Sequence, residues 1–303
     1  MHYCIEPYLN TDVQFRDMRQ LLIDSYKYLH WPVNWLTARI EDWRYGGNAM
    51  ELQDNPDYLN DKAWLWRTES GELAGFVLSE TGDNIWVQVH PDHADLARLA
   101  LHWVNDNWHP ESAKLYTFTD SKDQYRSTIL EDLGFRDLGE DSFLRGYELL
   151  SRNEFASIPD GFSLANLNEC PLEYELVTTV NETFNHRLPL KWLDSLLAAP
   201  SMEPSRIWFL RTNDDFVASF CFAWIDELNH IAELEPVGTH PEFRQRGLAK
   251  ALVQTVFDQL KYRGVEQVYI SSSTEKRATA FYDQLKPDSR WLTRRWVKDV
   301  HAL

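Results

Sequence analysis

The segment from residue 244 to residue 249 combines the residue types that a phosphate-binding loop needs. It reads Arg-Gln-Arg-Gly-Leu-Ala and opens a stretch whose apolar periodicity predicts a helix. A loop that enters a helix presents free backbone N–H groups at the positive end of the helix dipole. Gly247 and the small Ala249 would allow a phosphate to approach closely, and Arg244 and Arg246 add positive charge. The pattern predicts an anion site, although a short loop of this type is also compatible with a plain turn whose arginines are solvated.

Two glutamates precede this loop on a predicted strand. Glu233 and Glu235 are two residues apart, and alternate residues of a strand share a face. A carboxylate on that face could take a proton from a nucleophile, directly or through a water molecule. Pro236 complicates the parity, because proline within a strand usually marks a bulge or an edge. The pattern leaves open which glutamate acts, and each can equally be a solvated strand residue.

The elements that must position these residues occur twice along the chain. The pairs share type and order at offsets of roughly 144 to 157 residues, which indicates an internal repeat. They are two Pro-x-x-Trp-Leu segments in predicted helical stretches (32–36 and 189–193), two hairpins (63–79 and 207–225), two His-Pro pairs (90–91 and 240–241) with an amphipathic helix after each, two strands (114–119 and 267–271), two second helices (125–133 and 278–285) and two closing strands (142–149 and 291–297).

The repeat predicts an α+β fold made of two copies of one unit. The chain has 303 residues, which is long for a single domain. A polar stretch between Ser151 and Pro159 ends in Pro-Asp-Gly and suits a boundary. We therefore predict one domain at 1–152 and a second at 158–303.

The two copies differ directly after the His-Pro pair. The first copy continues with Asp-His-Ala-Asp-Leu-Ala at 92–97, which has no glycine and carries acidic residues instead of arginines. The second helices differ as well, since Leu130 stands in the first copy where Tyr282 stands in the second. We therefore expect the functional site in the second copy and no catalysis in the first.

Composition and charge narrow the class of partner. The formal charge of -17 disfavours nucleic acid and anionic membrane surfaces and suits a cationic acceptor. The longest apolar run, Phe216–Ile225, is about half the length of a membrane span. The first residues show no basic region followed by a long apolar run, so no secretory signal is expected. These features predict a cytoplasmic protein that does not bind membranes.

No pattern for a metal site or a nucleophilic triad is found. The three cysteines, Cys4, Cys170 and Cys221, are far apart and predict neither a disulfide framework nor a metal knuckle. The histidines include no His-Glu-x-x-His pattern and no nucleophile elbow. His240 is most simply a turn residue, because the first copy repeats it at His90.

Taken together, the strand end at 236–239, the His-Pro turn, the loop at 244–249 and its helix resemble the acyl-CoA-binding motif of the GNAT superfamily of N-acetyltransferases. In that motif Gln or Arg is followed by any two residues, Gly, any residue, and Gly or Ala. The stretch 278–285 looks like the family's second helix with its tyrosine. The resemblance covers most of residues 160–300 and, in outline, the first copy. It implies two tandem GNAT-like domains, each with a mixed, mostly antiparallel sheet flanked by helices and the first one degenerate.

The resemblance also implies a role for individual residues. Backbone groups of Val237 and Thr239 would pair with the pantetheine arm of acetyl-CoA like an added strand. The N–H groups of residues 244–250 would hold the diphosphate, and a backbone N–H near Val237 would meet the oxyanion. Tyr282, a phenol with an ordinary pKa of about 10, would protonate the departing thiolate.

The residues expected to contact the coenzyme are Val237, Gly238, Thr239, Arg244, Gln245, Arg246, Gly247, Leu248, Ala249, Lys250 and Phe281. The expected catalytic residues are Tyr282, Glu235 and Glu233, and no metal is expected. The chain departs from the family at Glu275, where an asparagine is common, and at Lys286-Pro287, where Gly-Phe is usual. The family's contacts around Ser272–Glu275 are therefore not carried over to this chain.

The expected activity is transfer of an acetyl group from acetyl-CoA, or of a longer acyl group, to an amine on a small molecule or a protein. The rival hypothesis is a non-catalytic acyl-CoA-binding or scaffold protein. A third hypothesis, another binder of nucleotide phosphates, is disfavoured because the loop lacks both the Lys-Ser ending of an NTPase loop and the Gly-x-Gly of a dinucleotide site.

Overall fold

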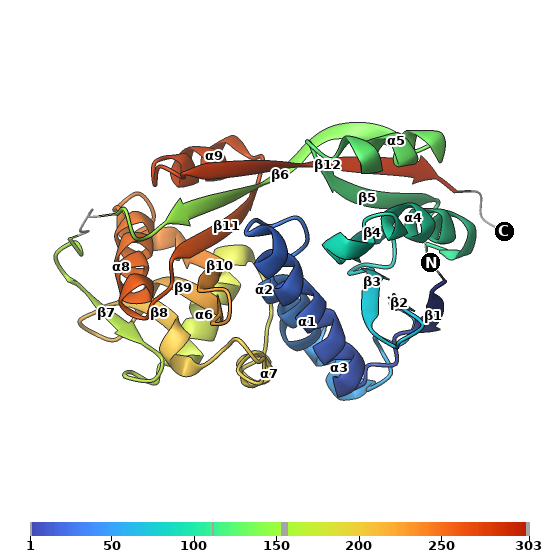
Figure 1. Ribbon diagram of the computed structural model, residues 1–303. Coiled ribbons are helices and arrows are strands. Elements are labelled where there is room, and N and C mark those ends of the chain that lie inside the picture. Colours follow the sequence, from blue (N-terminus) through green and yellow to red (C-terminus); the bar gives the residue numbers. More distant parts are fainter. Residues whose placement is uncertain (1, 111, 153–156, 301–303) are drawn as a thin grey trace. The chain divides into compact units, whose positions relative to one another are not determined.

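The computed structural model describes residues 2–110, 112–152 and 157–300, and the chain folds into two compact units. Neither unit is a continuous piece of sequence (Figure 1). The first comprises the chain up to Ile40, the segment Glu51–Phe143 and the C-terminal segment from Trp291. The second comprises Glu41–Met50 and Leu144–Arg290.

The first unit is built on a sheet with the strand order β1-β2-β3-β4-β5-β12-β6. Its helix α1 is capped by Thr11, whose side chain accepts from the Gln14 N–H, and it buries one apolar face. The strands are β1 (Cys4–Pro7), β2 (Ala63–Arg67), β3 (Leu73–Leu78), β4 (Asn84–Val89), β5 (Lys114–Asp120), β6 (Arg136–Glu148) and β12 (Ser289–Asp299), and the helices are α1 (Asp12–Leu29), α2 (Thr37–Asp42), α3 (Ala49–Asp54), α4 (Leu96–Asn107) and α5 (Gln124–Asp132).

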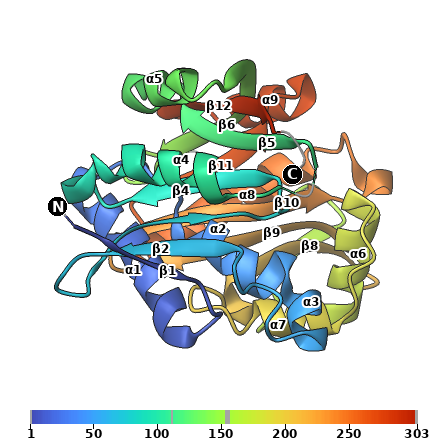
Figure 2. The ribbon, with the colours of Figure 1, turned by 90° about the vertical axis from the view of Figure 1, so that its right-hand side faces the viewer.

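The second unit is built on strands in the order β6-β11-β10-β9-β8-β7. Strand β9 is buried along its whole length and pairs antiparallel with both β8 and β10, whereas β10 and β11 are parallel (Figure 2). The strands are β7 (Phe162–Asn166), β8 (Ile207–Thr212), β9 (Val217–Asp226), β10 (Ile231–Thr239) and β11 (Gln267–Ser273), and the helices are α6 (Glu173–Phe184), α7 (Lys191–Leu196), α8 (Leu248–Tyr262) and α9 (Lys276–Asp283).

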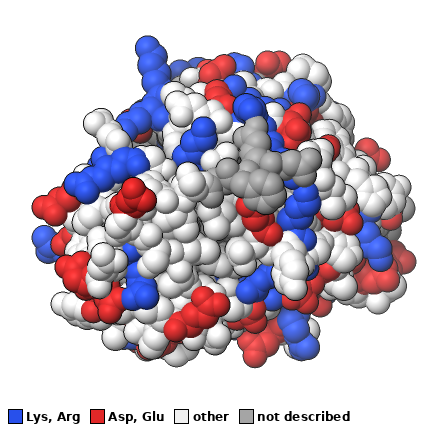
Figure 3. All heavy atoms as spheres, turned by 90° about the vertical axis from the view of Figure 1, so that its left-hand side faces the viewer, with Lys and Arg blue, Asp and Glu red and all other residues white. Residues whose placement is uncertain are grey.

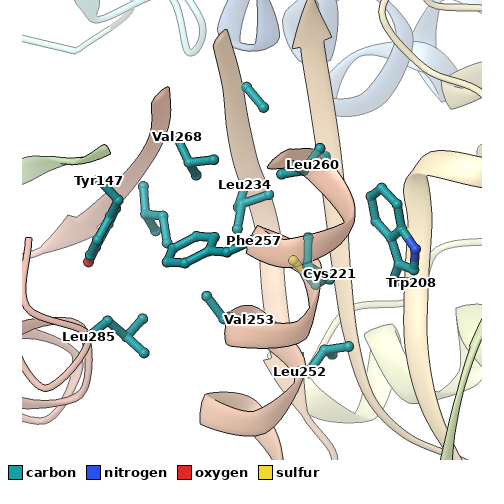
Figure 4. Packing of buried hydrophobic residues seen from close by; sticks show 14 of the residues in the cluster. Tyr147, Trp208, Cys221, Leu234, Leu252, Val253, Phe257, Leu260, Val268 and Leu285 are labelled. Carbon is teal, nitrogen blue, oxygen red and sulfur yellow. The ribbon is translucent and has the colours of Figure 1, made fainter. Parts of the chain in front are cut away.

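Helix α8 forms the core of the second unit together with the sheet. Its buried residues include Leu248, Leu252, Val256 and Leu260, the line that the periodicity of the sequence predicts. They pack against alternate residues of β9 and β10, among them Cys221 and Leu234 (Figure 4).

The two copies have exchanged their closing strands. Strand β12, the end of the second copy, pairs antiparallel with β5 of the first unit, and Trp296 is buried in the core of that unit. Strand β6, the end of the first copy, lies beside β11, and Tyr147 and Leu149 belong to the core of the second unit (Figures 1 and 4). The boundary predicted between 152 and 158 therefore separates the repeats but not the compact units. Residues 153–156 of the predicted linker lie outside the described residues.

One local prediction differs from the structure. Pro32–Leu36 lies in the loop between α1 and α2 and is not helical, since Pro32 cannot continue α1 and the next helix begins only at Thr37. The amphipathic helix predicted after the first His-Pro pair is α4, whose buried face is formed by Leu96, Ala100, Val104 and their neighbours.

Within the described residues no helix has both the length and the hydropathy to cross a bilayer. The charged side chains on the face drawn in Figure 3 are mixed in sign, with Lys and Arg among Asp and Glu. The net negative charge of the chain is thus not expressed as a uniformly acidic surface on this face. A cationic acceptor would have to be selected by particular carboxylates.

Candidate active site

The site in the second unit begins where strands β10 and β11 stop pairing. Their parallel register covers Ile231, Ala232 and Glu233, the last of which lies opposite Tyr269. Strand β10 continues to Thr239 with a register shift against β9 between Leu234 and Val237, so a bulge is present there. The sequence signal for this bulge is Pro236. Beyond Glu233, the edge of β10 that faces away from β9 has no paired strand among the described residues.

The loop that follows β10 presents a row of backbone N–H groups. Helix α8 begins at Leu248, and its first bond runs from the Ala251 N–H to the Gly247 carbonyl. None of the N–H groups of residues 245–250 donates to a backbone carbonyl of the described residues. Gln245 (φ 63°) and Gly247 (φ 77°) are both left-handed. Alternating backbone hands of this kind form a concave nest of N–H groups that suits an anion.

Position 247 favours glycine because of its backbone conformation, and not because neighbouring atoms leave no room for a side chain. A Cβ built there would meet no protein atom within 4 Å, but φ of 77° lies in the left-handed region that disfavours side chains. The space above this peptide is therefore open to a ligand.

The two arginines of the loop have different surroundings. Arg244 donates from Nε to the Thr239 carbonyl and from Nη2 to the Thr183 carbonyl, both at 3.1 Å. Its guanidinium fixes the loop to the end of β10 and to α6, and its own N–H is directed to the Pro241 carbonyl at 3.4 Å. Arg246 is exposed, with its guanidinium 5.0 Å from the centre of the Phe243 ring. The positive charge available to a bound anion is thus that of Arg246 and Lys250 in addition to the backbone.

The turn before the loop is held by His240. Its Nδ1 accepts from the Glu242 N–H, and its Nε2 is bonded to the Glu182 carboxylate. These two bonds show a structural role for His240.

Gly238 lies against the side chains of Phe220 and Thr183, where a Cβ would be only 2.4 Å from the Phe220 ring. The described residues contain no group of three or more metal-ligating side chains.

Tyr282 lies on α9 and packs, half-buried, against the core of the second unit on the α8 side. Phe281 contacts its ring edge-on, with centroids 4.9 Å apart. The pKa of the Tyr282 phenol is raised, first by burial and then by the proximity of Cys221 and Glu235. Tyr282 and Val237 thus pack against the same core cluster, which contains Cys221.

The two glutamates do not share an environment. Glu233 is 7% exposed and stands between Ala232 and Leu234, which both pack toward α8, so its side chain points to the opposite face of the sheet. Glu235 lies in the bulge, is partly buried and is near enough to Tyr282 to influence its pKa. Because the bulge breaks the alternation, the common face that two-residue spacing predicts does not hold here.

The equivalent region of the first unit is filled by the chain itself. Strand β4 pairs in parallel with β5 only at Asn84 and Ile85. Beyond them Trp86 stacks on Phe118 at 4.1 Å, and Arg126 donates from Nη1 to the Val87 carbonyl at 2.9 Å.

Val87 stands three residues before the His-Pro pair, as Val237 does in the second copy, so the same strand edge is closed in the first unit. Leu130, at the place of Tyr282, is completely buried.

One residue near Tyr282 is not indicated by any motif. Arg145 of β6 has no exposed side-chain surface, and its guanidinium lies 5.7 Å from the centre of the Tyr282 ring. Sequence reasoning missed it because β6 belongs to the first copy and only the strand exchange brings it to this site. Its only sign in the sequence is the presence of an arginine, between Leu144 and Gly146, within a predicted closing strand.

Comparison with known protein families finds a match in the second unit. Residues 173–286, from α6 to just beyond α9, match the acetyltransferase (GNAT) family, so this part of the chain is a GNAT domain. No curated protein matches the chain in sequence.

Solved structures match over nearly the whole length. A tandem GNAT protein from the clavulanic acid biosynthesis pathway has 13% identity and a TM-score of 0.64, with 100% of both chains covered. A GCN5-related N-acetyltransferase from Sphaerobacter thermophilus has 18% identity and a TM-score of 0.62, covering 97% of this chain and 95% of that one. A GNAT-family acetyltransferase from Colwellia psychrerythraea has 12% identity and a TM-score of 0.63, covering 97% and 100%. These matches confirm the predicted fold of two tandem GNAT-like domains.

Proposed function

Because residues 173–286 form a GNAT domain, we propose that the second unit transfers an acetyl group from acetyl-CoA to an amine and that the first unit does not bind the coenzyme. The observation that carries this proposal is the combination of two features: the N–H groups of residues 245–250 donate to no backbone carbonyl of the described residues, and no described strand pairs with the edge of β10 at Val237 and Thr239 that faces away from β9. The N–H groups of the loop suit a diphosphate, and the backbone groups along the edge of β10 suit the two amides of a pantetheine arm.

In this proposal the N–H groups of Gln245 to Lys250 hold the diphosphate at the start of α8, with Arg246 adding charge. Backbone groups of Val237 and Thr239 bind the pantetheine amides as a neighbouring strand would. The arm then runs along β10 toward the bulge, where the core side chains of Cys221, Tyr282 and Phe281 enclose the thioester. Gly238 supports this edge from the opposite side through its close packing on Phe220.

Glu233 is the better placed of the two candidate bases. The charge of Glu235 raises the pKa of Tyr282, and a carboxylate charge near the departing sulfur opposes formation of a thiolate. The acceptor nitrogen has to reach the carbonyl carbon away from the leaving sulfur. Glu233, buried on the other face of β10, is on that side and takes the proton from the amine, directly or through a water molecule.

The nitrogen of the neutral amine attacks the thioester carbonyl, and a backbone N–H near Val237 stabilises the resulting oxyanion. The C–S bond breaks as the electron pair of the oxyanion restores the carbonyl, and the bonding electrons leave with the sulfur. Loss of the amine proton to Glu233 completes the amide, and that proton returns to the thiolate through solvent. The products are the acetylated amine and free coenzyme thiol.

Tyr282 acts in this scheme as a hydrogen-bond donor to the departing sulfur. Its ordinary pKa of about 10 is already about 1.5 units above that of a thiol, and burial raises it further. Complete transfer of the phenol proton would therefore be uphill by more than about 2 kcal/mol, at 1.36 kcal/mol per pKa unit. Donation without full transfer stabilises the developing charge and leaves the phenol protonated.

Direct transfer is favoured over an acyl-enzyme on Cys221. The thiol is completely buried, and burial raises its pKa well above the ordinary value. The thiolate is the reactive form of cysteine, and it is disfavoured at this position. Cys221 therefore serves as a packing residue beside the thioester.

The test is calorimetric titration with acetyl-CoA followed by thiol release with a panel of primary amines, from polyamines to peptide N-termini and lysine side chains. We expect binding by the whole chain, with a Kd in the range of about 1 µM to 1 mM, and thiol release with at least one amine. Binding without turnover on any amine would favour the non-catalytic acyl-CoA-binding alternative. Absence of binding would contradict the proposal.

A further inference from the structure

Two residues of the exchanged strand β6 contact the segment of α9 that carries Tyr282. Arg145 and Tyr147 are alternate residues of this strand and so share one of its faces. Both are completely buried in the second unit, although in sequence they belong to the first copy. The face they share is turned toward α9 and the core around α8, where Figure 4 shows Tyr147 beside Leu285.

Arg145 binds α9 and β11 at the same time. Its Nε donates to Asp283 Oδ1 at 2.9 Å, and its Nη1 donates to Ser272 Oγ at 2.8 Å. The guanidinium lies 5.7 Å from the centre of the Tyr282 ring, within the range of a cation–π contact. Asp283 directly follows Tyr282, so this ion pair fixes the backbone at the tyrosine.

Tyr147 fixes the same tyrosine through its backbone. Its hydroxyl donates to the Tyr282 carbonyl at 3.1 Å, and its ring packs on Phe257 of α8 with centroids 5.2 Å apart. The carbonyls of the last turn of a helix have no partner within the helix. The Tyr282 carbonyl accepts from the Leu285 N–H at 3.1 Å, and the Tyr147 hydroxyl is its second donor, at the position from which the Tyr282 side chain projects.

We propose that Arg145 and Tyr147, supplied by the copy that does not bind the coenzyme, are positioning residues that hold Tyr282 of the other copy in place for acyl transfer. This inference rests on the proposed function of the second unit. It gives the degenerate copy a chemical contribution in addition to its own fold.

The charge of Arg145 also matters for the reaction. A buried guanidinium near the phenol lowers its pKa, in opposition to burial, and favours negative charge nearby. The sulfur gains negative charge as the C–S bond breaks and Tyr282 donates to it. Arg145 therefore makes the phenol a stronger donor in the transition state, while ground-state binding of the coenzyme depends on residues elsewhere.

The test is a double-mutant cycle on turnover, made with Arg145→Gln, Tyr282→Phe and the combined variant. We expect Arg145→Gln to lower kcat by roughly 10- to 100-fold while the Kd for acetyl-CoA changes by less than about threefold. In the Tyr282→Phe background the same change should lower kcat by less than about threefold, because the residue acts through the phenol. Arg145→Lys, which keeps the charge, should recover part of the loss.

Arg295 provides the matched control. It lies on the other exchanged strand, β12, with its guanidinium 4.2 Å from the centre of the Tyr116 ring in the first unit. Arg295→Gln should leave kcat within about twofold of the original chain. Tyr147→Phe, which retains the ring, is the second variant if Arg145→Gln does not fold, and it should lower kcat with the Kd again unchanged.

Hydrogen exchange gives a readout that does not require turnover. Amides of α9 should exchange at least about tenfold faster in Arg145→Gln and in Tyr147→Phe, with α8 unchanged. An unchanged kcat in Arg145→Gln, or equal losses in both tyrosine backgrounds, would overturn the inference even if the chain proves to be an acetyltransferase. If the original chain neither binds nor transfers acetyl groups, the proposed function fails, and unchanged exchange in α9 would then overturn the positioning role as well.

Discussion

Arg126 donates from its guanidinium to the carbonyl of Val87 at 2.9 Å, and this bond closes the strand edge that, at the corresponding Val237, pairs with no described strand in the second unit. Burial disfavours the charged form of Arg126 and lowers its pKa, although it remains a cation at neutral pH. A guanidinium that satisfies a buried carbonyl is costly to displace, because the carbonyl would lose its partner. In the first unit the Arg126 guanidinium thus occupies the place that an amide of the pantetheine arm takes in the proposed complex of the second unit.

We therefore predict that the chain binds one molecule of acetyl-CoA and not two. Calorimetric titration of the whole chain measures this ratio directly. The Arg126→Ala variant should bind with the same ratio, because Trp86 and Phe118 still fill the space and the segment 92–97 after β4 carries acidic residues in place of the arginines and glycine of the second copy. A ratio of two in the unaltered chain would show that the first unit also holds the coenzyme.

Gly247→Glu should abolish binding of acetyl-CoA, at least about 100-fold in Kd, while the protein remains folded. The side chain would carry a negative charge into the place of the diphosphate. The left-handed backbone adds a penalty of roughly 1–2 kcal/mol in stability. Calorimetry and thermal unfolding measure the two effects separately.

Gly264→Glu is the control for that change, since Gly264 is also left-handed, with open space where a Cβ would stand, and lies just beyond the opposite end of α8. It should lose a similar amount of stability and keep normal affinity. Equal affinities for the two variants would refute the loop assignment.

Glu233→Gln should lower kcat/KM by roughly 10²- to 10⁴-fold, the usual cost of losing a general base. Glu235→Gln should change it by less than about threefold, because in the proposed mechanism the amine proton goes to Glu233. Steady-state kinetics on one amine acceptor compares the two variants. The opposite ranking would move the base to Glu235 and the acceptor to the α9 side.

Tyr282→Phe should lower kcat by roughly 10- to 150-fold, which corresponds to the about 1.5–3 kcal/mol of a hydrogen bond to a charged atom. The Kd for acetyl-CoA should stay within about threefold. Thiol release under saturating acetyl-CoA measures the first quantity and calorimetry the second. Normal turnover in this variant would assign the donor to water or to another group.

The expected pH dependence of kcat follows from the raised pKa of Tyr282. Because the pKa of Tyr282 is raised, the phenol remains protonated at pH values well above its ordinary pKa of about 10. We expect kcat to rise as the amine loses its proton and to show no descending limb below about pH 10. The stability that the neutral phenol contributes is complete below that value and declines above it, since only the unfolded chain then ionises. A descending limb near pH 8 that vanishes in Tyr282→Phe would contradict this account.

Much of the second unit is encoded locally. The apolar line of α8, the hairpin of β8 and β9, and the glycine before α8 each depend on neighbouring residues, so periodicity and turn chemistry predict them. The same holds for His240, whose capping of the Glu242 N–H is repeated by His90 and Asp92 in the first unit.

Other features depend on tertiary pairing, which neighbouring residues do not specify. The two closing strands, β6 and β12, carry similar patterns, and nothing in either pattern states which sheet it joins. Arg145 therefore remained outside the predicted site. The separation of Glu233 from Glu235 follows from the bulge at Pro236, which the sequence indicates without giving its effect on the two side chains.

The most direct test is a crystal structure of the chain with acetyl-CoA. We predict the diphosphate within hydrogen-bond distance, about 2.7–3.2 Å, of N–H groups among residues 245–250, and the thioester beside Tyr282 and Val237. A coenzyme bound at the first unit, or a diphosphate away from the start of α8, would contradict the central claim.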